Sequence, residues 1–401
     1  MTAPQPLPKL LILNQMAGPM TWELAEDAGR QLGQVALLTG HPDTLAKGST
    51  PQVQLSPAPS YRRGSFLTRA LSWLAYLLAA FFWLWRFPAR LPLLLFSNPP
   101  ILCWLGWLMW LLRRQPYAVM VHDIYPDIFV RMRRIPESHP LIRLWRWLNR
   151  KAYENARVVM TLGECMAANL EKQFDSAHTP AGRVQVIYPW VDTDRIRPIS
   201  KEENWFAREY HQVGKLTVMY SGNMGLGHDL ETMLEAACLL QGEPRLHFMF
   251  IGSGPKWSLV QQCQARYNLP NLTLLGWQPE EVLPYSLATA DVTLISLEQG
   301  ITGLAVPSKA IYALAAGSAL VLLSSAEGEL AEWLNRMESG LVVPSPQPQQ
   351  VADHLQSWLQ DDGFLQAVRE RARRSSLEYF SREKNFLQLY RVLIRNLNLS
   401  E

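Results

Sequence analysis

A glycine-rich segment, YSGNMGLGHDLETMLEAA at residues 220–237, has the composition of a phosphate-binding turn. Gly222 and Gly225 follow a short apolar run and precede a helical pattern. Glycines let backbone N–H groups approach a phosphate, and the positive end of a helix dipole favours the anion. The spacing GxxGxG differs from the GxGxxG of dinucleotide-binding folds, which disfavours an NAD-dependent enzyme. A structural turn without a ligand is the alternative interpretation.

A lysine at the start of a predicted helix is the second candidate, in GLAVPSKAIYALAAG at residues 303–317. Pro307 marks the start of the helix, and Ser308 and Lys309 fall in its first turn. A lysine is unfavourable beside the positive end of a helix dipole unless an anion is present. We therefore interpret Lys309 as a phosphate ligand, with a solvated surface lysine as the alternative. FIGSGPKW (250–257), which contains Lys256, repeats this order of strand, glycines and helix, but alone it indicates a structural turn.

The third candidate is a histidine followed by an acid, in VMVHDIYPD at residues 119–127. His122 and Asp123 end an apolar run that predicts a strand. A histidine in this position can hydrogen-bond a sugar or titrate near neutrality. A buried histidine with a purely structural role fits the same pattern.

Short apolar runs alternate with helical patterns along almost the whole chain, which predicts βαβ units and parallel sheets. The alternation is interrupted by the polar stretch 192–204. We expect an N-terminal domain over 1–198, a C-terminal domain over 199–380, and a helix over 381–401 that packs back on the first domain. Ligands of such sheets bind at the carboxyl ends of the strands, so the loops of the two domains are expected to face each other across a cleft.

The composition excludes several classes of protein. With 401 residues, 48% of them apolar, the chain can bury a sizeable core, which excludes a disordered protein. A net charge of +3 disfavours a protein that coats nucleic acid. The four cysteines lie far apart without metal-ligand spacing, which predicts neither a disulfide framework nor a zinc site and indicates a reducing compartment. The N-terminal residues read as a first strand rather than a signal peptide.

The positive charge is concentrated between Arg62 and Arg157. This window holds 14 arginines, one lysine and four acids, and eight of the 15 tryptophans. Arginine binds anionic head groups, and tryptophan prefers the polar boundary of a membrane. The helical pattern over 141–156 also places Arg143, Arg146 and Arg150 on one face, which fits membrane contact and a solvated face equally well.

An uncharged run, ALSWLAYLLAAFFWLW, lies in this window at residues 70–85. As a helix it would extend roughly 24 Å, which is short of the ~30 Å hydrocarbon core of a bilayer. We expect a protein that lies on the membrane surface rather than spanning it. The alternatives are a buried core helix and a true membrane span.

In this order the segments resemble glycosyltransferase family 4. VMVHDIYPD, VIYPWVDTDRIRP (186–198), the glycine-rich segment and VPSKAIYALAAG each match a motif of that family, and the match runs over nearly the whole chain. The GNxG and PSK motifs resemble the bacterial branch that builds exopolysaccharide, O-antigen or colanic-acid-type units on polyprenyl lipids.

The resemblance implies the α/β GT-B fold, with two Rossmann-like doubly wound domains. It also implies a retaining, metal-independent hexosyltransferase without a cofactor. The enzyme would move a sugar from a nucleoside-diphosphate sugar, UDP-linked by preference, to a polyprenyl-phosphate-linked or other glycolipid acceptor. We expect it in the cytoplasm, attached peripherally to the anionic inner face of the plasma membrane, with no nucleic-acid partner.

The resemblance also assigns residues to the site. The catalytic residues would be His122, Asp123 and Lys309. The residues that bind the donor would be Gly18, Gly222, Asn223, Gly225, Trp277, Ser308, Lys309 and Tyr312. No residues are assigned to a metal.

The chain departs from the family at several positions. The paired glutamates of the family fall on Leu304 and Tyr312. The arginine and lysine that many members place in the glycine-rich loop are replaced by Asn223 and Asp229. The two missing glutamates support an alternative hypothesis, in which a catalytically decayed GT-B protein acts as a binding or regulatory partner in a membrane-bound polysaccharide assembly.

Overall fold

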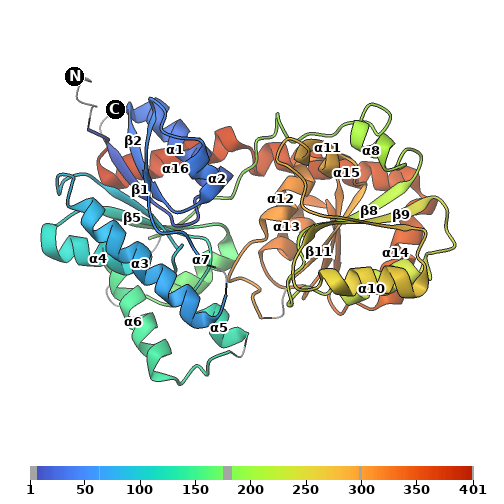
Figure 1. Cartoon of the computed structure of the whole chain (residues 1–401), viewed down its shortest axis with the longest axis horizontal. Helices are drawn as coiled ribbons and strands as arrows, with labels where there is room; N and C mark the ends of the chain where they lie inside the picture. Colours follow the sequence, from blue (N-terminus) through green and yellow to red (C-terminus); the bar gives the residue numbers. More distant parts are fainter. Residues whose placement is uncertain (1–6, 63, 133, 175–182, 298–299, 400–401) are drawn as a thin grey trace. The chain divides into compact units, whose positions relative to one another are not determined.

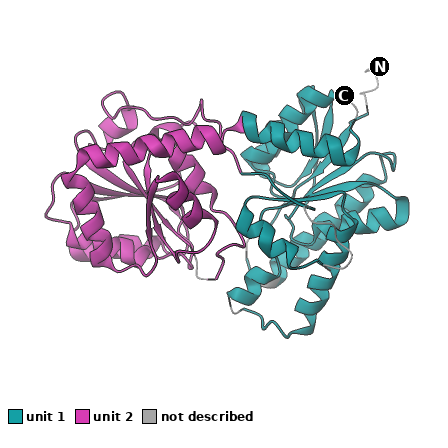
Figure 2. Cartoon of the chain, turned by 180° about the vertical axis from the view of Figure 1, so that it is seen from behind, with its two compact units in different colours: residues 1–188, 383–401 teal, residues 189–382 magenta. Residues whose placement is uncertain are grey.

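The computed structural model describes residues 7–62, 64–132, 134–174, 183–297 and 300–399. The chain divides into two compact units (Figure 2). Unit 1 comprises Met1–Tyr188 and Glu383–Glu401, and unit 2 comprises Pro189–Arg382. The division lies nearer the N-terminus than the expected residue 198, so residues 189–198 belong with unit 2.

Unit 1 is built on a sheet of seven strands in the order β3-β2-β1-β4-β5-β6-β7. All its pairs are parallel, and the order reverses between β1 and β4, as in doubly wound folds. The strands are β1 (Leu10–Leu13), β2 (Val35–Thr39), β3 (Val53–Pro57), β4 (Leu93–Phe96), β5 (Tyr117–Val121), β6 (Val158–Thr161) and β7 (Val184–Val186).

Eight helices connect or cover these strands in the described part of unit 1. They are α1 (Pro19–Leu32), α2 (Pro42–Ala46), α3 (Phe66–Leu84), α4 (Leu102–Arg113), α5 (Asp127–Arg131), α6 (Pro140–Asn155), α7 (Glu164–Glu171) and α16 (Arg382–Leu397). Helices α3 and α6 each contact α4, and the three lie on one side of the sheet (Figure 1). The last helix, α16, is tied to unit 1 by Gln388, whose Nε2 donates to the Val186 carbonyl at 2.9 Å.

Unit 2 repeats the architecture with six parallel strands in the order β10-β9-β8-β11-β12-β13. The strands are β8 (Leu216–Asn223), β9 (Leu246–Ser253), β10 (Leu272–Leu275), β11 (Val292–Ser296), β12 (Ala319–Leu323) and β13 (Gly340–Val343). The helices are α8 (Trp205–Glu209), α9 (Leu230–Leu239), α10 (Trp257–Tyr267), α11 (Leu283–Ala288), α12 (Ser308–Ala315), α13 (Glu329–Met337), α14 (Pro348–Gln360) and α15 (Asp362–Tyr379).

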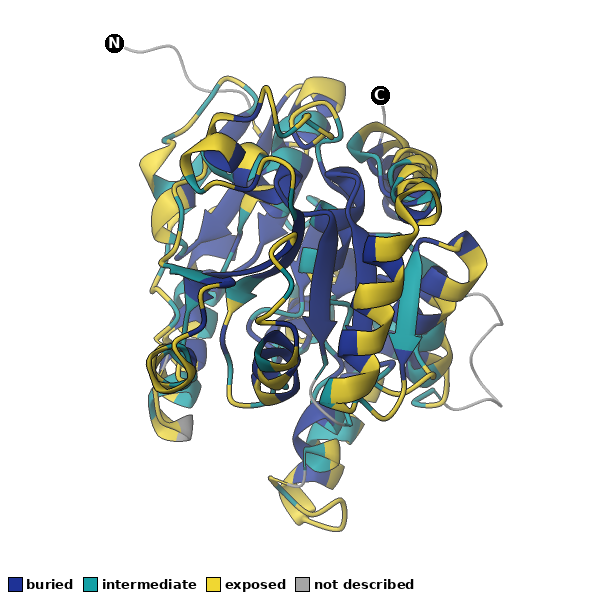
Figure 3. Cartoon of the chain, turned by 90° about the vertical axis from the view of Figure 1, so that its right-hand side faces the viewer, coloured by how far each residue is buried: buried dark blue, intermediate teal, exposed yellow. Residues whose placement is uncertain are grey.

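The central strands carry apolar side chains on both sides, because helices cover both faces of each sheet. Every residue of β1, β4 and β12 is buried, and Figure 3 shows the buried strands beneath helices whose outer sides are exposed. The edge strands β3 and β13 are only partly buried. They lack the long apolar run that predicts a buried strand, and the sequence analysis did not identify them.

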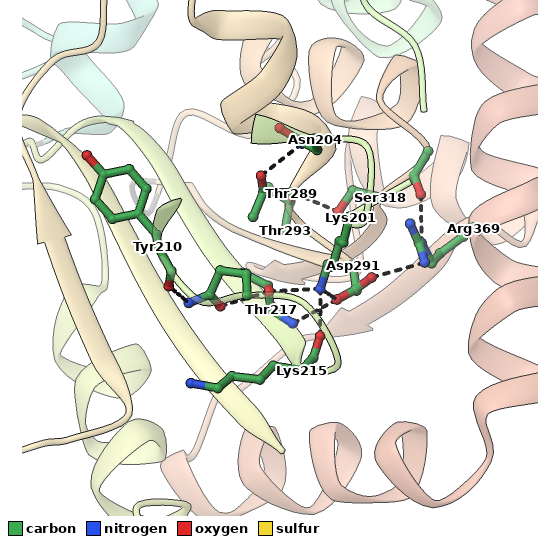
Figure 4. Close-up of polar contacts among 12 residues, drawn as sticks. Lys201, Asn204, Tyr210, Lys215, Thr217, Thr289, Asp291, Thr293, Ser318 and Arg369 are labelled. Carbon is green, nitrogen blue, oxygen red and sulfur yellow. Dashed lines mark hydrogen bonds and ion pairs between the residues drawn. The ribbon is translucent and has the colours of Figure 1, made fainter. Parts of the chain in front are cut away.

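A buried ion cluster anchors the start of unit 2 to its sheet (Figure 4). Asp291, just before β11, pairs with Lys201 and, at 3.0 Å, with Arg369 of α15. Lys201 also donates to the Lys215 carbonyl at 2.6 Å and to Thr217 Oγ1 at 2.9 Å. The cluster lies at the N-terminal ends of β8 and β11, away from the carboxyl ends where ligands of such sheets bind.

Candidate functional site

The switch in strand order in unit 2 falls between β8 and β11. These strands pair at only two positions, Val292 with Val218 and Thr293 with Met219. Their carboxyl ends therefore diverge beyond Met219, and a doubly wound sheet binds its ligand at such a point. The predicted Gly222 and Asn223 end β8 here, and Gly225 lies in the loop that leads to α9.

The glycine segment at residues 250–257 packs against the glycine-rich segment at residues 220–237. Gly252 has φ +139°, and a Cβ added there would lie 2.0 Å from the Gly222 carbonyl oxygen. Met224 N donates to the Ser253 carbonyl at 2.7 Å, and Lys256 N donates to the Met224 carbonyl at 3.0 Å. The close approach of these two backbone segments requires a glycine at position 252. Residues 250–257 therefore support the backbone of the glycine-rich segment that is the candidate phosphate site.

Lys309 lies at the carboxyl end of β8. Its Nζ donates to Tyr220 Oη at 3.1 Å and stands 4.3 Å from the centre of the Tyr220 ring. A Cβ added at Gly222 would be 3.4 Å from this Nζ. Burial lowers the pKa of Lys309 to about 8. Within the part of the chain that the structure describes, no carboxylate pairs with this ammonium group, although buried charges are normally paired. The arrangement favours an anionic ligand.

The other predicted donor residues of unit 2 occupy two places. Ser308 is the exposed first residue of α12, and Tyr312 lies one turn further along the same helix. Trp277 follows β10 and is 60% exposed. In the order β10-β9-β8 its strand is separated from β8 by β9, so Trp277 lies to one side of the Lys309 group.

His228 was missed by the sequence analysis, although it lies in the glycine-rich segment. Its Nδ1 is 2.8 Å from the carbonyl oxygen of Ser296, which ends β11. Lys256 holds the His228 carbonyl at 2.6 Å and the Glu231 carboxylate at 2.7 Å. Lys256 therefore positions the loop through these two bonds. His228 belongs to the candidate site, although its contact with β11 could not be predicted from the sequence.

The predicted residues of unit 1 gather at the carboxyl ends of β4 and β5. The backbone N–H groups of His122 and Asp123 both donate to Ser97 Oγ, at 2.8 and 3.3 Å. The His122 ring packs edge-on against Phe96, with ring centres 5.2 Å apart. One hydroxyl thus fixes the turn that presents the histidine and the acid.

Burial favours the uncharged form of both of these side chains, compared with the same groups in water. It lowers the pKa of His122 to about 4 and raises the pKa of Asp123 to about 6. His122 Nε2 is buried and has no hydrogen-bond partner among the described residues. Buried polar atoms are usually hydrogen-bonded, so this nitrogen lacks the partner that such an atom normally has.

Gly18 precedes α1, in the loop that follows β1. Its φ is −77°, and a Cβ added there would meet nothing within 4 Å. The chain itself therefore does not require a glycine at this position. The open space beside Gly18 is compatible with the predicted approach of a ligand to the loop.

Metal ligands do not gather in the described parts of the chain. No group of three or more His, Cys, Asp or Glu residues among them is placed to hold a metal ion. The independence from metal that the sequence analysis predicts stays a prediction.

Comparisons with known proteins also divide the chain into two parts, with the division between residues 195 and 215. Residues 17–195 match the family model described as Glycosyltransferase Family 4, and residues 215–361 match the model described as Glycosyl transferases group 1. The chain is 25% identical over 232 residues to "Probable glycosyltransferase WbjE" of Pseudomonas aeruginosa, covering 58% of this chain and 57% of that protein. It is 31% identical over 133 residues to "Putative colanic acid biosynthesis glycosyl transferase WcaI" of Escherichia coli K12, covering 33% and 32%.

Solved structures with the same architecture include HepE of Anabaena in complex with UDP, at a TM-score of 0.73 and 13% identity over 96% of this chain and 100% of HepE. WaaG, a glycosyltransferase involved in lipopolysaccharide biosynthesis, has a TM-score of 0.68 and 16% identity over 96% of this chain and 99% of WaaG. At these identities the likeness concerns the fold.

Proposed function

We propose a function from the premise that the chain belongs to the glycosyltransferases, with a Glycosyltransferase Family 4 domain followed by a Glycosyl transferases group 1 domain in a GT-B fold. It transfers a sugar from a nucleoside-diphosphate sugar, UDP-linked by preference, to a polyprenyl-phosphate-linked or other glycolipid acceptor. The transfer retains the anomeric configuration and uses neither a metal ion nor a cofactor. The names of WcaI and WaaG support a role in the synthesis of cell-surface polysaccharide.

Lys309 is the observation that carries the proposal. Negative charge builds on the departing diphosphate as the sugar bond breaks, and a fixed cation in a water-poor site stabilises that charge. Lys309 is half-buried, has no carboxylate partner among the described residues and lies beside Gly222, where a phosphate can approach the backbone. The start of α12 adds Ser308 and the positive end of its helix dipole.

His122 and Asp123 act on sugar hydroxyl groups in this proposal. The neutral His122 offers its unpartnered Nε2, and Asp123 offers a carboxylate whose oxygens accept hydrogen bonds. Neither residue is needed as a nucleophile if the acceptor attacks from the face that the diphosphate leaves. Retention is checked by determining the anomeric configuration of the product by NMR.

A membrane surface is the proposed location of the acceptor. Helix α3 has 19 residues and is about 28 Å long. It is the one described helix long and apolar enough to cross a membrane, but a third of its apolar window is buried inside the protein. Trp73, Tyr76 and Trp83 face the core, whereas other apolar residues of α3 are exposed: Leu67, Leu71, Leu74, Leu78 and Phe82. A helix that is partly embedded in the protein and exposes its other apolar residues fits an interfacial position better than a membrane span.

Exposed arginines support an anionic membrane as the partner of this surface. Three of the four acids between Arg62 and Arg157 pair with Arg146 or Lys151. Several arginines of the window are exposed and form no ion pair with described residues: Arg86, Arg90, Arg143 and Arg150. Arg113 and Arg114 stack on Trp85 and Trp110 at 4.6 and 4.4 Å. Such pairs of cation and indole suit the head-group layer.

The function is tested by thermal unfolding of the purified chain with UDP, GDP, ADP and NAD, each with and without EDTA. A ligand at 100 times its dissociation constant adds about 2.7 kcal/mol of stability. We expect UDP to raise the unfolding temperature and EDTA to leave that shift unchanged. A shift with GDP or ADP alone would contradict the preference for UDP. If no nucleotide stabilises the chain, the decayed binding protein suggested by Leu304 and Tyr312 is the better hypothesis.

A further inference from the structure

We propose that His228 is a neutral hydrogen-bond acceptor for the donor and presents Nε2 to a hydroxyl group of the bound nucleotide sugar. This inference rests on the proposed function, because it concerns the same end of β8. It assigns a specific contact to a residue that the sequence analysis did not select.

The contact between His228 and Ser296 fixes the tautomer of the ring. Nδ1 lies 2.8 Å from the Ser296 carbonyl oxygen, which can only accept a hydrogen bond. Nδ1 therefore carries the hydrogen, and in the neutral ring Nε2 is left with a lone pair. Nε2 has no hydrogen-bond partner among the described residues and is not one of their buried unsatisfied atoms. It is free to accept a hydrogen bond from a ligand.

The backbone around His228 is held on three sides. His228 N donates to the Gly225 carbonyl at 3.1 Å, and the His228 carbonyl accepts from Lys256 Nζ at 2.6 Å. Asp229 N donates to Ser296 Oγ at 2.7 Å. One of these bonds lies within the loop, and the other two come from the start of α10 and the end of β11. The position of the ring is therefore set before a ligand binds, as a specific contact requires.

The surrounding charges favour the neutral ring. Burial lowers the pKa of His228, and the charges of Lys309 and Lys256 lower it further, against a smaller opposing effect of the Ser296 carbonyl. The nearby acids are engaged elsewhere. Glu231 pairs with Lys256, and the Asp229 carboxylate caps α9 through Thr232. No acid is thus placed to hold a proton on Nε2 within the described segments.

His228 lies in the same group of residues as Lys309. Its ring centre is 6.2 Å from that of Tyr220, over which Lys309 Nζ stands at 4.3 Å. A Cβ added at Gly225 would lie 3.2 Å from His228 Cδ2 and 3.7 Å from Nε2. The absence of a side chain at 225 therefore leaves the approach to Nε2 open.

His228 and Lys309 bind different parts of the donor. Lys309 is a cation and attracts the diphosphate. A phosphate oxygen placed against Nε2 would meet a lone pair and be repelled, whereas a hydroxyl would donate to it. His228 thereby selects for a sugar hydroxyl and leaves the anion to Lys309.

The experiment compares three variants, His228→Gln, His228→Leu and His228→Lys, by calorimetric titration with UDP and with UDP-glucose. Glutamine retains an acceptor, leucine retains bulk alone, and lysine supplies a cation. We expect His228→Leu to weaken binding of UDP-glucose roughly tenfold, as for the loss of one buried hydrogen bond, and His228→Gln to retain most of the affinity. Equal losses for UDP would identify the ribose as the source of the hydroxyl, and a loss confined to UDP-glucose would identify the transferred sugar.

Proton uptake on binding separates the neutral acceptor from a cation. Titrations with UDP-glucose at pH 7 in buffers of different ionisation enthalpy should give the same uptake for wild type and His228→Gln, because any uptake by Lys309 is common to both. A larger uptake by wild type, or tighter binding by His228→Lys than by His228→Gln, would overturn the inference. So would unchanged affinity in His228→Leu. If wild type binds neither ligand while the chain is folded, the proposed function fails instead.

Discussion

At the scale of single residues, the ionisation of Lys309 makes donor binding dependent on pH. Burial lowers its pKa to about 8 in the free protein, so the cation is lost as the pH rises through this value. We expect the dissociation constant for UDP to increase above pH 8, by at most about tenfold per unit. Lys309→Arg should remain charged and remove this dependence. Calorimetric titration between pH 7 and 9.5 measures both, and a flat profile for wild type would exclude Lys309 as the anion ligand.

The ionisation of Asp123 should make the rate of transfer fall on the acid side of the pH profile. Its raised pKa of about 6 means that it is ionised above this pH and protonated below it. If the carboxylate accepts a hydrogen bond from a sugar hydroxyl, kcat/KM should fall below pH 6. Asp123→Asn should lower kcat/KM about 100-fold and lack this limb. An acid limb that persists unchanged in Asp123→Asn would assign it to another group.

The sequence showed part of the site for identifiable reasons. Lys309 could be predicted because a lysine in the first turn of a helix is unfavourable without an anion. His122 and Asp123 could be predicted from their place after an apolar run. The role of His228 depends on Ser296, 68 positions later in the chain, and no local pattern reports such a contact. Lys256 has the residue type of a phosphate ligand, but its bonds to His228 and Glu231 are visible only in three dimensions.

At the scale of elements, the Asp291 cluster connects β11, α15 and the segment around Lys201. Asp291→Asn would leave Lys201 and Arg369 without their buried partner, which typically destabilises a protein by about 3–5 kcal/mol. We expect a loss of this size in the free energy of unfolding of unit 2, measured by urea denaturation. Asp353→Asn on α14, whose partner is the exposed Gln349, is the matched control and should change stability by less than about 0.5 kcal/mol. Similar losses in both variants would contradict the role of the cluster.

The elements that the sequence predicted well are those with a strong apolar pattern. The buried strands β1, β4, β5 and β12 correspond to continuous apolar runs. Helix α3 was expected at 70–85 but begins at Phe66, because Ser65 caps it by accepting from Thr68 N at 3.3 Å. Helix α15 was not expected, because its charged residues obscure the apolar face that Leu365, Val368 and Ala372 form.

At the scale of the whole molecule, the exposed apolar face of α3 predicts binding to anionic membranes. Wild type should float with vesicles that contain phosphatidylglycerol, and less so at high salt, because the arginines contribute a screened attraction. The double variant Leu71→Glu and Leu78→Glu should remain in solution. Leu239→Glu, which alters an exposed leucine of α9 in unit 2, is the control and should float like wild type. Loss of floating in all variants, or in none, would contradict the assignment of α3.

The division into units also shows what the sequence could not provide. The stretch 192–204 is polar and contains proline, so it reads as a linker between domains. Arg373 of α15, however, donates to the carbonyls of Thr193 and Ile196 at 2.9 and 3.1 Å. Lys201 joins the Asp291 cluster. These contacts attach the stretch to unit 2 and explain why the division falls at Tyr188.

The most direct test of the account is the affinity for UDP in the presence of EDTA, measured for wild type, Lys309→Ala and Lys215→Ala. Lys215 directly precedes β8, at the end of the strand opposite to the end beside which Lys309 lies, so it is a control of the same residue type outside the site. We predict binding by wild type and Lys215→Ala, and a loss of about 10- to 100-fold for Lys309→Ala, as for a hydrogen bond to a charged group. Equal affinity in all three proteins, or binding that EDTA abolishes, would contradict a metal-free donor site built on Lys309.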